Sequence, residues 1–284
     1  MKSEILVSAV QLSDLIAAGD GLVVDCRFDL TRTGKGRIDW LAGHIPGAVY
    51  AHLDDDLAAP VGSHTGRHPL PETERFAEFL AASGWSSDKL LVAYDDGPNA
   101  ISARLWWMMR YYGKRAALLD GGLRSWVDAG LRLESGEPIV VAAPVESLTA
   151  DPDMAVSTEI IAQQLGSPDT VILDARAPER FAGEIEPLDV RAGHIPGALN
   201  RAFSENLEAS GRFRDAGELR KVFENLLAGK DATQVVHSCG SGVTACHNLF
   251  AMELAGLKNS LLYPGSWSQW ITDPERPVAM GRKP

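Results

Sequence analysis

One cysteine in this sequence stands where a thiol could act as a nucleophile. Cys239 ends an apolar run, Gly240 and Gly242 follow it closely, and a helical pattern begins at about Val243. Glycines let successive backbone N–H groups turn inward and form an anion-binding nest, which the start of a helix extends. Both features favour the thiolate, which is the nucleophilic form of cysteine. The pattern therefore predicts a reactive thiol at Cys239.

The other two cysteines do not share this setting. Cys26 lies at the end of an expected strand, and Cys246 lies about two turns into the expected helix, so both are interpreted as structural, with a redox role for Cys246 left open. Three scattered cysteines are too few for a disulfide scaffold, and no Cys/His cluster has zinc spacing. We therefore expect no metal, no cofactor and a reducing compartment, the cytoplasm.

Composition narrows the class of partner. The chain has 284 residues and a net charge of −11, which argues against nucleic acid or an anionic membrane as the main partner. No run approaches the roughly 18 to 20 apolar residues of a membrane span, and the first residues lack the apolar stretch of a secretory signal. The length favours two domains of ordinary size.

The chain reads as one unit written twice. The seven residues Ala-Gly-His-Ile-Pro-Gly-Ala occur at 42–48 and again at 192–198, and the run 23–27 recurs in altered form at 172–176. Such markers, in the same order and at nearly the same offset, indicate a tandem duplication. We predict domains at 1–137 and 156–284, joined by a proline-containing linker at 138–155.

Short β-branched runs alternate with longer helical patterns in each half, which predicts an α/β fold with a mainly parallel sheet flanked by helices. The expected strands are 22–24, 90–94 and 116–119 in the first half and 171–173, 233–237 and 260–262 in the second. The expected helices are 76–82, 101–112, 218–227 and 243–254.

The first half supplies an internal control for the cysteine loop. Aligning its strand 91–94 with the second half brings Asp95 or Asp96 opposite Cys239. A carboxylate cannot replace a thiol as nucleophile, so the first half is predicted to be catalytically silent. His44 and His194 occupy the same turn in both halves, and a feature shared with a silent half is interpreted as structural.

These motifs resemble a known family, the tandem-domain rhodanese sulfurtransferases, over nearly the whole chain. The resemblance rests on the duplicated Gly-His-Ile-Pro-Gly-Ala element and the single cysteine loop in the second half. The loop sequence Cys-Gly-Ser-Gly-Val-Thr is most similar to that of 3-mercaptopyruvate sulfurtransferases. It implies that sulfur passes from 3-mercaptopyruvate through a persulfide on Cys239 to cyanide, a thiol or thioredoxin, releasing pyruvate. Two tandem rhodanese-like domains are the fold it implies.

The resemblance also implies which residues bind the donor. It assigns Arg180 to the donor's carboxylate, and it places the persulfide within the backbone N–H groups of Gly240, Gly242, Val243 and Thr244. Thiosulfate, a compact dianion, would benefit from a cationic side chain inside the loop, and Gly240 offers none. The chain departs from the family at Leu188, where a second arginine is expected. Arg191, three positions later, is the candidate for reaching the same carboxylate.

A proton relay is implied as well. It would consist of Asp54 and His68 from the first half of the sequence and Ser241 from the loop, and it would assist proton movement as the C–S bond breaks.

Other functions stay open at this stage. Thiosulfate:cyanide sulfurtransferase is the nearest alternative, and a persulfide carrier without small-molecule turnover is another. Cysteine-dependent phosphatases need an arginine six residues after the cysteine, where this chain has Ala245, so that activity is not expected.

Overall fold

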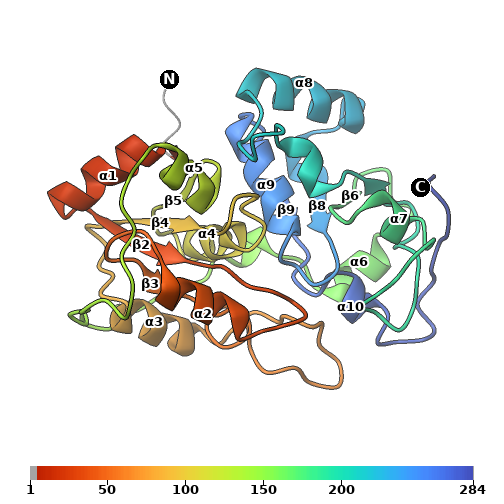
Figure 1. Cartoon of the computed structure of the whole chain (residues 1–284). Helices are drawn as coiled ribbons and strands as arrows, with labels where there is room; N and C mark the ends of the chain where they lie inside the picture. Colours follow the sequence, from red (N-terminus) through yellow and green to blue (C-terminus); the bar gives the residue numbers. More distant parts are fainter. Residues whose placement is uncertain (1–4, 284) are drawn as a thin grey trace. The chain divides into compact units, whose positions relative to one another are not determined.

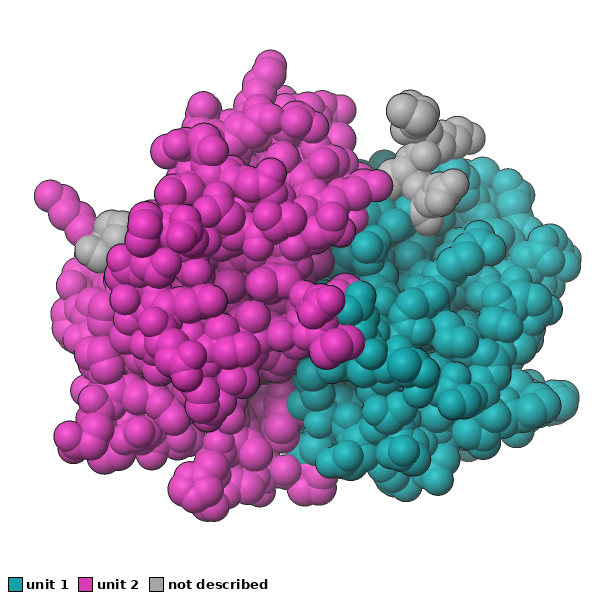
Figure 2. Space-filling model, turned by 180° about the vertical axis from the view of Figure 1, so that it is seen from behind, with its two compact units in different colours: residues 1–59, 70–151, 208–213 teal, residues 60–69, 152–207, 214–284 magenta. Residues whose placement is uncertain are grey.

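The computed structural model of the protein describes residues 5–283, which form two compact units (Figures 1 and 2). The first unit comprises the chain up to Ala59, together with Leu70–Asp151 and Glu208–Phe213. The second comprises Pro60–Pro69, Pro152–Leu207 and the chain from Arg214 onward. Each unit therefore contains one short segment from the other half of the sequence.

The first unit is built on a five-stranded parallel sheet in the order β1-β5-β4-β2-β3. The strands are β1 (Leu6–Val7), β2 (Gly21–Asp25), β3 (Val49–Tyr50), β4 (Leu90–Tyr94) and β5 (Ala116–Leu119). Both central strands, β2 and β4, are almost wholly buried. Continuous apolar strands of this kind are typical of a parallel sheet covered on both faces.

Five helices cover this sheet: α1 (Ala9–Ala18), α2 (Lys35–Ala42), α3 (Thr73–Ala82), α4 (Ser102–Tyr111) and α5 (Gly122–Asp128). Figure 1 shows α1 and α5 on one side of the sheet and α2 and α3 on the other. A capping box between Ser8 and Gln11 begins α1, satisfying backbone groups that the first turn leaves open. Trp106 and Trp107 of α4 are fully buried and therefore pack in the core of this unit.

The second unit repeats the plan with a parallel sheet in the order β7-β6-β8-β9. Its strands are β6 (Val171–Asp174), β7 (Leu199–Asn200), β8 (Val235–Ser238) and β9 (Leu261–Leu262), and Ala155 adds a parallel bridge beside β9. Its helices are α6 (Thr158–Gln163), α7 (Pro178–Phe181), α8 (Ala216–Leu227), α9 (Ala245–Leu254) and α10 (Ser266–Trp270), with 3₁₀ turns η1 (Pro152–Met154), η2 (Phe203–Asn206) and η3 (Ala232–Gln234).

The same pair of side chains braces the end of β2 in the first unit and of β6 in the second. Arg27 binds Asp25 through two guanidinium nitrogens and donates to the Gly43 carbonyl at 2.7 Å. In the second unit Arg176 binds Asp174 in the same way and donates to the Gly193 carbonyl at 2.8 Å. The duplication inferred from sequence is thus visible in buried contacts as well as in topology.

The duplicated turn is structural in both units, as expected. Nδ1 of His44 lies 2.8 Å from the Trp40 carbonyl oxygen, and Nδ1 of His194 lies 2.8 Å from that of Phe181. Both imidazoles are fully buried. Each histidine therefore ties its turn to the preceding helix.

The α/β fold with mainly parallel sheets is confirmed. The strands β4 and β5 begin and end where the sequence predicted, and the four predicted helices are present with bounds shifted by one to three residues. The two-residue strands β1, β3 and β7 were not predicted, because two residues are too few for a periodic signal. Among the described residues, no helix is both long and apolar enough to cross a membrane.

Candidate active site

Cys239 follows β8 directly, and the short helix α10 fixes the start of its loop. The N–H of Cys239 donates to Ser266 Oγ at 3.0 Å. In return its carbonyl oxygen accepts the N–H of Trp267 at 3.0 Å, and the carbonyl of Gly240 accepts that of Ser268 at 2.9 Å. The thiol residue is only 2% exposed. The backbone of Cys239 is therefore held on both sides of the thiol.

Other groups approach both loop glycines closely. Gly242 has φ of 75°, and a Cβ there would lie 2.2 Å from the carbonyl oxygen of Pro264. A Cβ on Gly240 would lie 2.8 Å from a terminal nitrogen of Arg67 and 3.6 Å from both terminal nitrogens of Arg180. Gly242 is thus required by the backbone, whereas at Gly240 the close groups are the ends of two arginine side chains.

The corresponding loop of the first unit shows what this kind of backbone binds. Asp25 pairs with Tyr94 and Asp174 pairs with Ser238, so Asp95 is the counterpart of Cys239. The Asp95 carboxylate accepts four backbone N–H groups of its own loop, those of Gly97, Asn99, Ile101 and Ser102, at 2.8 to 3.3 Å. Burial raises the pKa of Asp95, and these hydrogen bonds oppose the rise. The loop type is an anion nest in the silent half.

Ser241 and His68 meet beside the thiol. Nδ1 of His68 lies 2.7 Å from Ser241 Oγ, and both residues are nearly buried. His68 belongs to the segment Pro60–Pro69, which packs with the second unit although it comes from the first half of the sequence. Asp54 belongs to the first unit, where burial raises the pKa of its carboxyl group. Its part in a relay stays a prediction.

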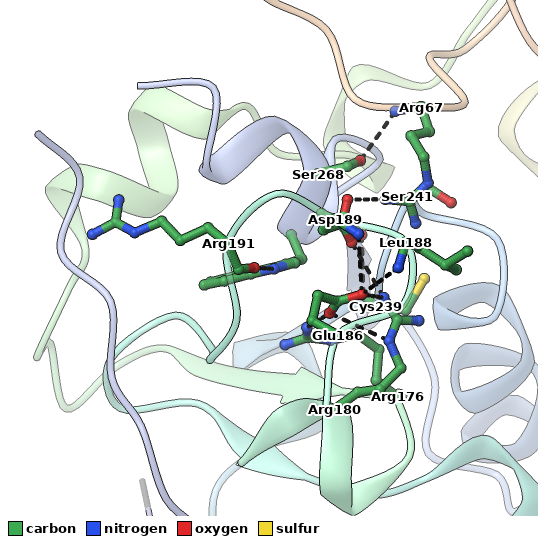
Figure 3. A network of polar contacts seen from close by, with 12 residues as sticks. Arg67, Arg176, Arg180, Glu186, Leu188, Asp189, Arg191, Cys239, Ser241 and Ser268 are labelled. Carbon is green, nitrogen blue, oxygen red and sulfur yellow. Dashed lines mark hydrogen bonds and ion pairs between the residues drawn. The ribbon is translucent and has the colours of Figure 1, made fainter. Parts of the chain in front are cut away.

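Arg180, at the end of α7, is brought to the loop as the sequence suggested. Its guanidinium lies against Gly240, and it forms ion pairs with Glu186 at 2.7 Å and with Asp189 at 3.2 Å (Figure 3). The side chain is 16% exposed, so a small anion could still reach it. Arg180 therefore offers a cationic anchor next to the nucleophile.

Arg191 is not brought to the loop. Its guanidinium donates to the carbonyl oxygens of Pro274 and Arg276, both at 3.3 Å. Figure 3 shows the side chain extending away from Cys239. Its backbone carbonyl accepts the indole N–H of Trp267 at 2.9 Å, so the residue has a packing role here. Leu188, in the position where a second arginine was expected, is 41% exposed.

Sequence reasoning missed two arginines near the thiol. Arg67 forms an ion pair with Asp189, and its N–H donates to Ser268 Oγ at 3.0 Å. Arg176 is 3% exposed, and burial acts to lower its pKa, but the attraction of Asp174, Glu186 and Cys239 raises it overall. The signal for Arg176 was present in the duplicated Asp-x-Arg. For Arg67 the sequence carried no signal beyond the position of this residue next to His68.

Comparison with known proteins gives the family. The profile of the rhodanese-like domain matches this chain twice, over residues 8–129 and 157–273. The chain belongs to the rhodanese family. It is a tandem-domain sulfurtransferase of that family, an enzyme that acts on a sulfur donor and an acceptor.

Several relatives are similar over almost their whole length. A probable 3-mercaptopyruvate sulfurtransferase of Pseudomonas aeruginosa is 48% identical over 284 residues, covering 99% of this chain and 100% of the relative. A putative thiosulfate sulfurtransferase of Mycobacterium tuberculosis is 37% identical over 282 residues, covering 99% and 98%. The solved 3-mercaptopyruvate sulfurtransferase from Leishmania major superposes with a TM-score of 0.82 at 32% identity, covering 93% of this chain and 73% of that one.

The remaining cysteines of this rhodanese-family enzyme have settings unlike that of Cys239. Burial, followed by the charges of Asp25 and Asp95, raises the pKa of the Cys26 thiol well above its usual value, which keeps it protonated. The Cys246 thiol is fully buried and lies 3.3 Å from the carbonyl oxygen of Gly242. Within residues 5–283, no three His, Cys, Asp or Glu side chains are grouped so as to hold a metal ion.

Proposed function

We propose that this sulfurtransferase takes sulfur from 3-mercaptopyruvate onto Cys239 and passes it to a thiophilic acceptor, releasing pyruvate. The observation that carries the proposal is the Arg180 guanidinium, which lies against Gly240, the residue directly after the nucleophile. An arginine in this place can hold a carboxylate while the donor's sulfur, two carbons further along, faces the thiol. Arg191 has no part in the proposal, because its guanidinium is bound to two backbone carbonyls.

The loop itself favours this donor over thiosulfate. Residues 240–244 carry no cationic side chain, so the charge available to a donor lies beside Gly240 and not inside the nest. Thiosulfate presents its charge close to the sulfur that is transferred, whereas mercaptopyruvate presents it at the far end of the molecule. Some relatives are named for 3-mercaptopyruvate and others for thiosulfate. We therefore base the proposed donor on the residues of the site.

In the first half-reaction, the Cys239 thiolate attacks the sulfur of the donor. An S–S bond forms, the C–S bond breaks, and its electron pair goes to the carbon that becomes the enolate of pyruvate. The proton of the donor thiol ends on that carbon, giving pyruvate and a persulfide anion on Cys239. Atoms and charge balance without an oxidant or a cofactor.

In this proposal Ser241 and His68 move that proton. Their 2.7 Å contact joins a hydroxyl to an imidazole, two groups that can each accept one proton and donate another. The part of Asp54 in this relay rests on the sequence resemblance alone. In this proposal Ser241 touches the donor and His68 acts through it.

In the second half-reaction, the persulfide anion rests among the backbone N–H groups of Gly240, Gly242, Val243 and Thr244 until an acceptor removes its outer sulfur. Oriented backbone dipoles of this kind stabilise a localised negative charge without reorganisation. Cyanide, a small thiol or reduced thioredoxin are acceptors of the right chemistry. Because Cys239 must stay reduced between turnovers, we propose a reducing compartment such as the cytoplasm.

A donor comparison tests the proposal. Pyruvate and thiocyanate are followed with 3-mercaptopyruvate or thiosulfate plus cyanide, for wild type, for Cys239→Ser and for Cys246→Ser as a matched thiol control. We expect kcat/KM to favour mercaptopyruvate by at least about tenfold, with Cys239→Ser inactive and Cys246→Ser active. A higher kcat/KM with thiosulfate would show that thiosulfate, and not 3-mercaptopyruvate, is the preferred donor. One equivalent of pyruvate without turnover would indicate a persulfide carrier, and activity in Cys239→Ser would remove the persulfide mechanism.

A further inference from the structure

Asp189 lies between two guanidinium groups at the edge of the cysteine loop. One of its carboxylate oxygens pairs with Arg67 and the other lies 3.2 Å from Arg180. Its side chain is only 4% exposed, whereas those of the two arginines are 28% and 16% exposed. Both guanidiniums also lie against Gly240, and Figure 3 shows Asp189 and the two arginines at the Cys239 loop. A carboxylate is therefore already bound where the proposed donor needs to place its own.

Glu186, the other acid in this network, has a different task. One of its oxygens accepts the backbone N–H groups of Leu188 and Asp189, both at 3.1 Å, besides the ion pair with Arg180. It thus holds the backbone of the loop that carries Asp189. The Asp189 carboxylate, by contrast, binds the side chains of Arg67 and Arg180.

The backbone around Asp189 leaves its side chain a route to water. Leu188 is 41% exposed and Val190 is 98% exposed, so Asp189 belongs to a loop at the surface of its unit, and a rotation about its own side-chain bonds would take the carboxylate off the guanidiniums. Because Glu186 keeps the backbone in place, this rotation does not require the loop to refold.

We propose that Asp189 is an internal carboxylate that the anionic donor displaces, and that Arg67 shares the donor's carboxylate with Arg180. This inference rests on the proposed function. It adds Arg67 as a second residue that binds the donor's carboxylate and Asp189 as the group that competes with the donor. The affinity for the donor then equals the free energy of its contacts to the guanidiniums minus that of the Asp189 contacts that it replaces. Uncharged thiols, which cannot compete for the arginines, are excluded from the donor position.

Two substitutions test the pair in opposite directions. Asp189→Asn keeps the shape of the side chain and removes its charge, so KM for 3-mercaptopyruvate should fall about three- to tenfold with kcat within twofold. Arg67→Met should raise KM about tenfold or more, because a charge-assisted hydrogen bond is lost, and Arg67→Lys should recover part of it. Opposite changes in KM at nearly constant kcat are not what general damage to the fold would produce.

The exposed pair Arg220 and Glu224 of α8, 2.8 Å apart, supplies matched controls in the same unit. Glu224→Gln and Arg220→Met change net charge in the same way, and they should leave KM unchanged. The same order should appear in the affinity for pyruvate, measured by calorimetry in a Cys239→Ser background, where no chemistry occurs. Asp189→Asn should bind pyruvate more tightly and Arg67→Met more weakly than the background protein.

The two proposals fail separately. If Asp189→Asn binds pyruvate no better, or more weakly, Asp189 serves to position the arginines and the inference is overturned. If Arg67→Met binds pyruvate as the background does, the second anchor is wrong. If wild type forms no persulfide from 3-mercaptopyruvate in a single turnover while the pyruvate affinities still follow the expected order, the inference about anion binding holds and the proposed donor does not.

Discussion

The loops that follow β4 and β8 begin at equivalent positions, but the first begins with Asp95 and the second with Cys239. In the first unit Asp95 turns its carboxylate back into its own loop and accepts four backbone N–H groups. In the second unit the same position is Cys239, and guanidiniums lie against the next residue. A nest that is filled by its own side chain is a structural element. With the smaller Cys239 side chain in that place, the nest is left for an anion from outside under the proposed function.

Two further positions follow the same division. Strand register makes Ala93 the counterpart of His237, and counting along the loops makes Gly97 the counterpart of Ser241. The second unit therefore carries polar or reactive side chains where the first carries small ones. The scaffold of braced strands and buried turns is common to both, so the difference in chemistry comes from a few loop and strand positions.

The largest expected effect comes from transferring the silent residue into the reactive loop. Cys239→Asp should lower sulfur transfer at least about 10³-fold, because the nucleophile is gone. At the same time its carboxylate should accept loop N–H groups as Asp95 does. Its thermal unfolding midpoint, measured by calorimetry, should therefore equal or exceed that of Cys239→Ala. A much lower midpoint for the Asp variant would show that the two loops are not equivalent nests.

The reverse experiment empties the nest of the first unit. Asp95→Ala leaves buried N–H groups without their acceptor, so urea unfolding should show a loss of about 2 kcal/mol. The neighbouring Asp96, whose side chain is 70% exposed, provides the control, and Asp96→Ala should change stability by less than about 0.5 kcal/mol. Equal effects of the two substitutions would argue against a structural role for the Asp95 carboxylate.

The smallest expected effect, taken per pH unit, is a pH dependence that comes from a buried group of the second unit. Burial lowers the pKa of His237 from 6.5 to about 3, so the unfolded chain binds one more proton than the folded chain between those values. The free energy of unfolding should fall, by up to about 1.4 kcal/mol per pH unit from this group, as pH decreases through that window. His237→Gln should remove this contribution.

The slope of the free energy of unfolding against pH is measured by urea titrations at several pH values between roughly 7 and 4. The exposed His64 gives the control, since His64→Gln should leave the slope as in wild type. If His237→Gln and wild type have the same slope, the buried imidazole is not neutral in the folded protein.

The sequence allowed the fold to be predicted where local patterns were strong. The strand 90–94 is a continuous apolar run with polar residues on both sides, and its bounds were predicted correctly. The reactive cysteine loop was recognisable because its strand, its glycines and its helix are contiguous. The same holds for Arg176, whose pairing with Asp174 repeats that of Arg27 with Asp25, although its closeness to the thiol was not foreseen.

What could not be predicted depends on contacts between distant segments. Arg67 reaches Asp189 across 122 positions of the sequence, and an arginine before a histidine carries no mark of such a partner. Arg191 was given a role from its spacing to Leu188, but a spacing does not show which way a side chain points in an irregular loop. In the structure its guanidinium donates hydrogen bonds to two backbone carbonyl oxygens.

The segments that each unit takes from the other half of the chain have a consequence for synthesis. The first unit lacks Glu208–Phe213 until about 62 residues beyond Asp151 (213 − 151) have been translated, roughly 3 to 12 s at ordinary ribosomal rates. The second unit, by contrast, has its donated segment, with His68 and Arg67, available before any of its own strands are made. Vectorial synthesis thus delivers the site's distant residues early, while completion of the silent unit waits for the chain to grow well into the catalytic one.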